Sequence, residues 1–366
     1  MRSGSSVSLY LTMIDVGQGE SFVIDFPDGT FALIDAGPIS ATSRVLAQVS
    51  KRVAAKRRFR WAAATQWDAD HIGGFPAVLA SHKPEEFVLP ALDLGQYEEL
   101  LAAVDPTSPA RRAVTRLSES LLDSDITQTL AWARQEIPDC GVDVNGWFLS
   151  PDKGVKDELT SSIKSKTLSS ERLRALGNRT SLVLIVSAYE RSLFFPGEIE
   201  WDQYETVRVQ FENRRRPTRA TLRSQVVKLS HHGSERNNPV EFFQHFCADQ
   251  AIGLASAGGR HGHPSPITIR DLRRVVDGQA LCTGLGQPCN EIIHGRKPND
   301  GEFNWASSTP WRNMVSPGKK CHGDVVVEVT ARGHVRFATE SVQPLCPFAK
   351  PPTPPRGASR ARRRPV

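Results

Sequence analysis

The sequence predicts an α/β fold, and two observations carry this prediction. The first is a set of three strands near the N-terminus, at residues 7–16, 21–26 and 30–37, whose alternation and intervening glycine turns are typical of a meander. The second is the strand, helix, strand order that follows. Residues 39–58 have apolar side chains at helical spacing, and a short apolar run then ends at Thr65. Alternating elements of this kind build layered α/β domains.

The remaining elements continue the alternation. Strands are expected at residues 178–186, 192–200 (with a turn), 225–230, 251–259, near 282, 323–329 and 334–337, and helices from residue 75 and over 267–276. The last two strands are expected to complete the second half of the domain. Residues 92–140 place leucines and alanines among charges, which predicts a helical insertion. Residues 151–177 are polar and are expected to form a mobile loop.

Composition describes an ordinary soluble globular protein, with 366 residues, 39% hydrophobic and 23% charged. No run approaches 18 apolar residues, so no membrane span is expected, and without an apolar signal core we expect a cytoplasmic location. Residues 344–366 are rich in proline and arginine and are expected to be disordered, which leaves residues 1–343 as one domain. All six excess positive charges lie in residues 350–366. This basic tail either adds non-specific nucleic-acid affinity or is a solvated terminus.

Cysteine usage leaves one question open. Six cysteines in a cytosolic chain are usually reduced core residues or metal ligands. Cys282, Cys289 and Cys321 fall in one region with His294 and His322 nearby. Their spacing matches no standard ribbon or finger, so this region holds either a small structural zinc site or ordinary buried thiols.

The densest chemistry lies in the loop Thr65–Gly74, where Asp68, Asp70 and His71 directly follow a buried strand. Carboxylate oxygens beside a neutral imidazole suit zinc, manganese or iron. The alternative is an acidic loop in which an aspartate caps a helix. The second densest stretch is the strand end at His231 and His232, which glycine closes.

Several motifs, taken together, resemble the metallo-β-lactamase-fold hydrolases, in the form of the domain found in ComEC-type competence proteins and their free-standing relatives. They occur in family order, namely Asp15-Val-Gly-Gln-Gly-Glu20, Leu33-Ile-Asp35, the loop Thr65–Gly74, Gly197-Glu198, Lys228-Leu-Ser-His-His-Gly-Ser234 and Gly262-His-Pro264. Three positions depart from the family pattern. Gln66 replaces the first histidine of the loop, Glu20 replaces an aspartate, and the longer Glu198 replaces the aspartate whose carboxylate bridges two metals in the family. The third family histidine is missing as well.

The resemblance implies an αββα sandwich with a divalent metal, zinc or manganese, held by loops at one sheet edge. Asp70, His71, Glu198 and one of the pair His231 and His232 would bind one firm ion. Asp68 and Gln66 would contribute to a second ion that is weak or absent.

Three further positions follow from the same resemblance. His263 would protonate the leaving group or complete the metal shell, and Asp70, His232 and His263 are the catalytic candidates. Asp35 would support the metal loop from behind, with Asp15 as a weaker candidate; alternatively, both only cap turns.

The expected function is hydrolysis of DNA phosphodiesters by a metal-activated water. Two alternatives remain: a hydrolase of a small phosphodiester, nucleotide or ester, and a degenerate, non-catalytic module that binds nucleic acid or a protein. Loss of two histidines motivates the last alternative.

Overall fold

The structure is a computed structural model. It describes residues 8–90, 92, 94–104, 107–141, 143–165, 177–212, 222–258, 263–284 and 321–340. The predicted tail at 344–366, with its basic residues 350–366, and Cys289 lie outside these ranges. None of the described helices is both long and apolar enough to cross a membrane.

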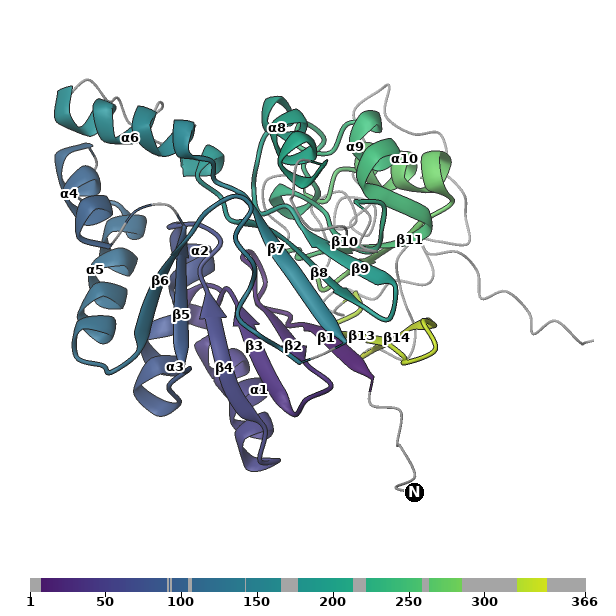
Figure 1. Cartoon of the computed structure of the whole chain (residues 1–366), viewed down its shortest axis with the longest axis horizontal. Helices are drawn as coiled ribbons and strands as arrows, with labels where there is room; N and C mark the ends of the chain where they lie inside the picture. The colour runs from purple at the N-terminus through teal and green to yellow at the C-terminus, as the bar shows by residue number, and fades with distance from the viewer. Residues whose placement is uncertain are drawn as a thin grey trace, which may run out of the picture.

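Two sheets form the centre of the described structure (Figure 1). The first sheet has the order β14-β13-β1-β2-β3-β4-β5-β6 and the second the order β12-β11-β10-β9-β8-β7. The strands of the first sheet are β1 (Leu9–Met13), β2 (Phe22–Asp25), β3 (Thr30–Ile34), β4 (Arg58–Ala63), β5 (Glu86–Pro90), β6 (Thr127–Ala131), β13 (Val325–Val329) and β14 (Val335–Thr339). Those of the second are β7 (Val144–Ser150), β8 (Val183–Ala188), β9 (Arg191–Phe195), β10 (Ser224–Lys228), β11 (Cys247–Ala255) and β12 (Gln279–Cys282).

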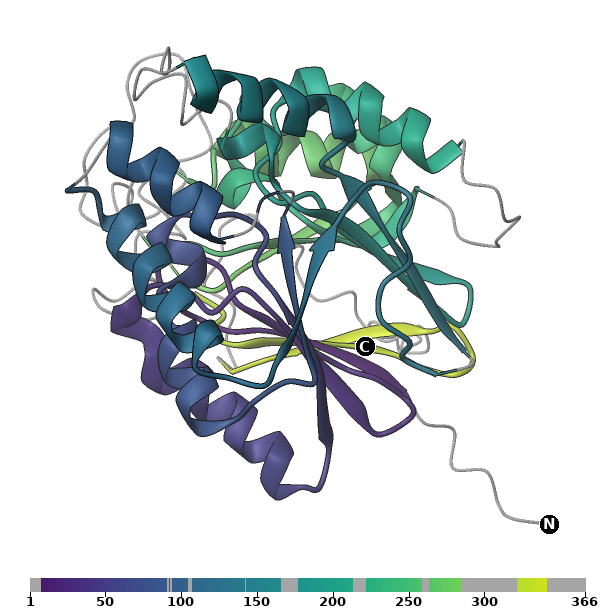
Figure 2. The same cartoon turned by 60° about the vertical axis from the view of Figure 1, so that its left-hand side comes forward.

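Helices cover the outer face of each sheet, and Figure 2 shows the two sheets stacked between them. Beside the first sheet lie α1 (Thr42–Ala54), α2 (Ala69–Ile72), α3 (Phe75–Ser81), α4 (Leu94–Val104) and α5 (Pro109–Leu122). Over the second lie α8 (Trp201–Glu212), α9 (Val240–Phe246) and α10 (Pro266–Val276). Helix α6 (Lys153–Ser165) follows β7, and short 3-10 turns occur at Ile39–Ala41 (η1) and His231–Gly233 (η2).

Three hydrophobic clusters establish the layer order. The first joins Phe31 and Leu33 of β3 to helices α1, α3 and α5. The next residues along the same strand, Ala32 and Ile34, face the cluster between the two sheets. The third cluster joins the second sheet to α8, α9 and α10. Because successive side chains of a strand point to opposite faces, one short apolar strand serves two cores. The expected αββα sandwich is confirmed.

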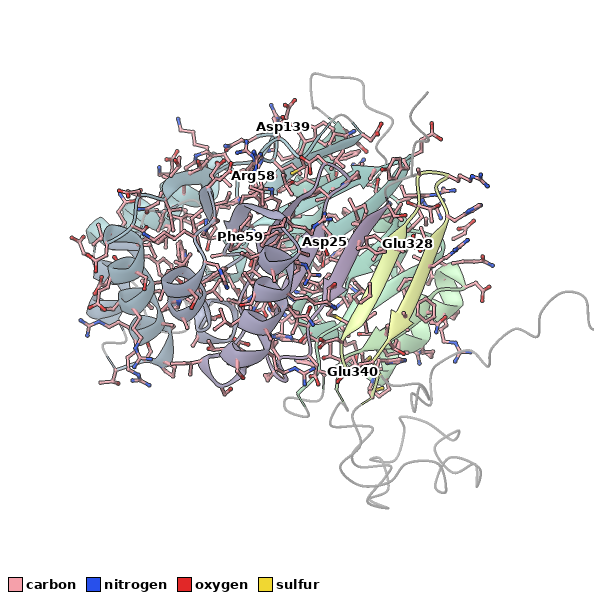
Figure 3. The ribbon with its side chains drawn as sticks, turned by 90° about the horizontal axis from the view of Figure 1, so that it is seen from below. Asp25, Arg58, Phe59, Asp139, Glu328 and Glu340 are labelled. Carbon is pink, nitrogen blue, oxygen red and sulfur yellow. The ribbon has the colours of Figure 1, made fainter. Side chains whose placement is uncertain are left out.

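The expected position of the last two strands was wrong. β13 pairs antiparallel with β1, with Thr12 opposite Val326, and β14 pairs with β13. Both strands therefore extend the first sheet rather than the second. Figure 3 shows β13, marked by Glu328, beside the N-terminal strands. Strand patterns reveal which face is buried but not the partner, so a pairing across more than 300 residues could not be read from the sequence.

Two segments differ from their expected form. Among the described residues of the segment 92–140, helices form only at α4 and α5. Thr127–Ala131 instead forms the strand β6, which pairs in parallel with β5. A run of five residues is too short for periodicity to separate strand from helix. The polar segment expected as a loop contains α6 from Lys153 to Ser165, and residues 166–176 lie outside the described ranges.

Candidate metal centre

The loop after β4 is shaped by close backbone contacts. A Cβ atom on Gly74 would lie 2.2 Å from the Ala36 carbonyl oxygen, so only glycine allows this approach. The Thr65 amide and hydroxyl both donate to the Asp35 carboxylate, at 2.7 and 2.5 Å. Asp35 itself has a left-handed backbone, with φ 55°. These contacts fix the start of α2, which carries Asp70 and His71.

His71 is buried between two carboxylates. Its Nδ1 lies 2.8 Å from Asp35 Oδ2, and its Nε2 lies 3.2 Å from Glu198 Oε1. The side chains of His71 and Asp35 are fully shielded from solvent. A carboxylate behind a histidine ring fixes its orientation and leaves the other nitrogen free to bind a metal. This is the position that the resemblance implied for Asp35.

His232 approaches Glu198 from the second sheet, but among the described residues its Nδ1 has no hydrogen-bond partner. Its Nδ1 lies 3.6 Å from Glu20 Oε1, and its Nε2 lies 3.3 Å from Glu198 Oε1 and 3.5 Å from Asp70 Oδ2. The Glu20 carboxylate forms an ion pair with Lys228, and both side chains are about 1% exposed. Lys228 Nζ also donates to the Gly197 carbonyl oxygen at 2.6 Å, which anchors the turn that carries Glu198.

The pair His231 and His232 follows β10 in an unusual backbone conformation, with φ of 46° and 54°. Left-handed conformations of residues other than glycine cost about 1–3 kcal/mol each and persist only where surrounding contacts hold them. Asn238 supplies such contacts, since its side chain bonds the Ser230 amide and the Ser230 and Ser234 carbonyl oxygens. The turn sends the two imidazoles to opposite sides of Glu198.

Four buried residues therefore meet, each with one ligand atom within 4.8 Å of the others: Glu20, His71, Glu198 and His232. In the described ranges this is the one such group of His, Cys, Asp and Glu. The sequence analysis missed Glu20 as a member. The available signal was its place at the end of the motif that begins at Asp15.

The other predicted residues lie around this group. His231 Nδ1 is 3.2 Å from Glu198 Oε2, and its ring centroid is 5.6 Å from that of His263. Gln66 is buried, and neither polar atom of its amide has a hydrogen-bond partner among the described residues. Asp68 is exposed at the N-cap position of α2.

Asp15 lies in a different environment. It accepts from the Gly17 amide, as in a turn cap, and lies 3.9 Å from Arg44. Of the three cysteines considered for a structural zinc site, Cys282 and Cys321 are buried. They belong to no metal-binding group in the part of the chain that the structure describes.

Electrostatics in the group oppose the effect of burial. Burial alone would lower the pKa of both histidines, but Asp35 and Glu198 raise the pKa of His71 well above its usual value. Likewise, Asp70 and Glu198 raise the pKa of His232 to about 9 despite its burial. Burial would raise the pKa of Glu198, whereas His232 and His71 lower it well below its ordinary range. These opposite shifts in pKa show that the carboxylates favour positive charge at the two imidazoles, and a divalent cation could supply that charge in place of protons.

The donor set fits such a cation. Two buried imidazole nitrogens converge with the carboxylate oxygens of Glu198, which is buried, and of Asp70, which is about one third exposed. Zinc accepts nitrogen and oxygen ligands of this kind.

Comparison with known proteins gave one curated relative. The chain is 25% identical over 280 residues to ComE operon protein 3 of Bacillus subtilis (strain 168). The match covers 72% of this chain and 30% of that protein, so the chain spans about a third of the relative's length. The expected likeness to ComEC-type proteins is confirmed by this match. No family model matches the chain.

Similar solved structures have the metallo-β-lactamase fold or bind zinc, at low overall similarity. A mutant metallo-β-lactamase from Cronobacter sakazakii matches 59% of this chain and 74% of its own, with 13% identity and a TM-score of 0.34. Zinc-bound PqqB from Methylobacterium extorquens matches 75% of this chain and 98% of its own, with 8% identity and a TM-score of 0.40.

Proposed function

We propose that the protein is a metal-dependent hydrolase that cleaves phosphodiester bonds in DNA. The observation that supports this proposal is the meeting of His71 Nε2 and His232 Nε2 at one oxygen of Glu198, with a buried carboxylate behind each ring. Metal-binding imidazoles are typically oriented by an acceptor at their other ring nitrogen, and Asp35 occupies this place behind His71. The substrate class follows from the ComEC-type resemblance.

In this proposal, Asp70, His71, His232 and Glu198 hold one zinc or manganese ion. A divalent cation supplies Lewis acidity there and lowers the pKa of a water towards neutrality. Glu20 is assigned a different task, although it lies within reach of the group. Because Lys228 already neutralises Glu20, we assign it to orienting His232 through Nδ1.

The side of Glu198 that carries Oε2 is assigned to proton transfer. His231 lies against this oxygen, and its side chain is about one third exposed. The ring of His263 lies beside that of His231. These two imidazoles would move protons between solvent, the attacking water and the leaving oxygen. Any second ion at Oε2 would be weak. Gln66 stands where the family has a histidine, and a carboxamide is a poor ligand for zinc.

A second candidate is hydrolysis of a small phosphodiester or ester. The charge distribution favours it, since residues 1–349 contain 40 basic and 40 acidic residues. They therefore carry no net positive charge that would attract a long nucleic acid. Nucleotide-sized and polymeric substrates can be compared directly.

The test combines metal analysis with substrate assays. Protein purified without chelators is expected to contain about one zinc or manganese ion per chain by mass spectrometry, and Asp70→Ala is expected to lose it. Supercoiled plasmid, single-stranded DNA and bis(p-nitrophenyl) phosphate then report the substrate. Absence of bound metal, together with no activity after zinc or manganese is added, would overturn both enzyme candidates and favour a non-catalytic binding module. Cleavage of the small ester alone would overturn the nuclease assignment.

A further inference from the structure

A cavity of about 770 Å³ opens directly beside Asp70. Its walls come from the turn at Val16–Gln18, the segment Pro38–Ser40, the start of α2 and one face of α5. None of the four residues of the buried group is among its described lining residues, whereas Asp70, whose Oδ2 lies 3.5 Å from His232 Nε2, is one of them. A volume of this size suits a ligand of one or two nucleotides, because small-molecule sites measure roughly 300–1,000 Å³.

Helix α5 turns two arginines towards this cavity. Arg112 and Arg116 both line it, and a spacing of four residues places them on one face, about 6 Å apart along the helix. The opposite face is fixed, because Val114, Leu117 and Leu121 are buried in the cluster beneath the first sheet. The helix also packs against α2 and α3. The arginines therefore stand on a rigid support next to Asp70.

Neither arginine is paired with an acidic residue in the part of the chain that the structure describes. Within the described residues, the Arg116 guanidinium has no hydrogen bond or ion pair, and that of Arg112 donates only to the Thr107 carbonyl oxygen, at 2.5 Å. By contrast, Arg52 and Arg57 near the first sheet are both paired with Asp25. Among the described residues that line the cavity, Asp70 alone is acidic. Two adjacent like charges without a partner favour an anionic ligand.

We infer that Arg112 and Arg116 form a phosphate-binding subsite, which holds the phosphate group next to the one that is cleaved. Guanidinium groups bind phosphate oxygens through paired N–H donors, and two of them one helical turn apart reach the same group. The cavity volume of about 770 Å³ suits a dinucleotide or a short stretch of single strand better than a duplex, so we expect preference for the single strand. This inference rests on the proposed function for its location and adds the residues that select the substrate.

The test is a binding measurement in EDTA, in which no cleavage occurs. Wild-type protein, Arg112→Gln, Arg116→Gln and the double variant are titrated with a fluorescent 5′-phosphorylated dinucleotide, a single-stranded 12-mer and the duplex of the same sequence. Each single variant is expected to weaken single-strand binding about tenfold, since a charged hydrogen bond contributes roughly that factor. The dependence of log affinity on log salt should also become shallower by about 0.7 for each arginine removed.

Lys51→Gln is the matched control, because Lys51 is exposed on α1 and does not line the cavity. The substitution removes one positive charge, as each arginine variant does. The affinity of this control should equal that of the wild type. A double arginine variant that binds like this control overturns the inference, as does equally tight binding of the duplex. The dinucleotide shows whether the natural ligand is small or polymeric. If the arginine substitutions weaken binding of the dinucleotide and the 12-mer equally, the subsite belongs to a nucleotide-sized ligand.

The two proposals can fail separately. If the wild type binds the single strand through these arginines but cleaves nothing with zinc or manganese, the hydrolase proposal fails and the subsite stands. If metal-dependent cleavage occurs and the double variant has the wild-type KM and kcat, the subsite fails and the hydrolase proposal stands. The subsite predicts instead a raised KM with kcat nearly unchanged.

Discussion

At the scale of single residues, the proposed metal site depends on the carboxylates that lie behind the two histidine rings. Both buried histidines point Nε2 at Glu198, and the carboxylates behind them come from different parts of the chain. Asp35 follows β3, whereas Glu20 precedes β2 and needs Lys228 of β10 to balance its charge. Substitutions at these supporting residues test the arrangement without removing a proposed ligand.

Asp35→Asn is expected to weaken zinc binding about 10- to 100-fold, because the His71 ring loses its charged acceptor and the single remaining amide oxygen cannot serve both Thr65 and His71. Competition with a chromophoric chelator measures this affinity. Asp15→Asn is the control and should leave it unchanged, since Asp15 lies against Arg44. Equal losses in the two variants would argue against a specific role for Asp35.

Lys228→Met is expected to lower the free energy of unfolding by about 3–5 kcal/mol, because it leaves the Glu20 carboxylate buried without a counter-charge. The double variant Lys228→Met with Glu20→Gln should recover much of this loss. Urea denaturation of the two single variants and the double variant gives the coupling between the residues. Strictly additive effects would mean that the ion pair is not formed in solution.

Cys140 is expected to resist alkylation at pH 8. Burial raises the pKa of its thiol to about 12, although the Trp61 indole donates to its sulfur at 3.3 Å. Only about one molecule in 10,000 then carries the reactive thiolate. Iodoacetamide labelling followed by peptide mass spectrometry should leave Cys140 unmodified in native protein and label it in urea. Rapid native labelling would show that this side chain is accessible.

At the scale of elements, glycines allow the metal loop to lie against its neighbours. Gly73 and Gly74 follow α2, and added Cβ atoms would lie 2.5 Å from the Ala69 carbonyl oxygen and 2.2 Å from that of Ala36. These neighbours are backbone atoms, which cannot move aside as a side chain does. The loop must shift if either glycine is replaced.

Gly74→Ala is therefore expected to destabilise the protein by about 1–3 kcal/mol and to weaken metal binding as α2 moves. Gly154→Ala in α6 serves as the control, because its Cβ would meet only the end of the Asp152 side chain, at 3.2 Å. We expect less than about 0.5 kcal/mol there. Thermal melts with and without zinc compare the two variants, and similar behaviour would contradict the tight contact.

At the scale of the whole molecule, the C-terminal strand β13 completes the sheet that the N-terminal strands begin. Val327 is fully buried between the two sheets, whereas Val326 points to the other face and is partly exposed. The pairing of β13 with β1 therefore contributes to the central core as well as to the sheet edge.

Val327→Asp is expected to cost more than about 4 kcal/mol, because it buries an unpaired carboxylate between the sheets. Val326→Asp should cost less than about 1 kcal/mol, since that side chain reaches solvent. Soluble yield and melting temperature of the two variants report the difference. Equal tolerance of both substitutions would contradict the assigned register of β13.

Much of the fold could be predicted from local pattern. The three N-terminal strands, α1, α3 and α10 lie close to their expected positions, because amphipathic spacing and turn residues are local signals. Local signals failed at β6, which is too short for its period to be distinctive, and at α6, whose polar composition masked a helix. The motif order also pointed to Asp70, His71, Glu198 and the histidine pair before any geometry was known.

The sequence by itself determined the layered α/β architecture and most of the candidate metal-site residues, since both depend on residue types at short spacing. Only the tertiary structure decided that His232 rather than His231 turns inward with His71. It also placed Glu20 beside the His232 ring, paired with Lys228. It also decided that β13 joins β1 and that Arg112 and Arg116 face the cavity beside Asp70. These contacts join segments far apart in the chain, and packing fixes them rather than local propensity.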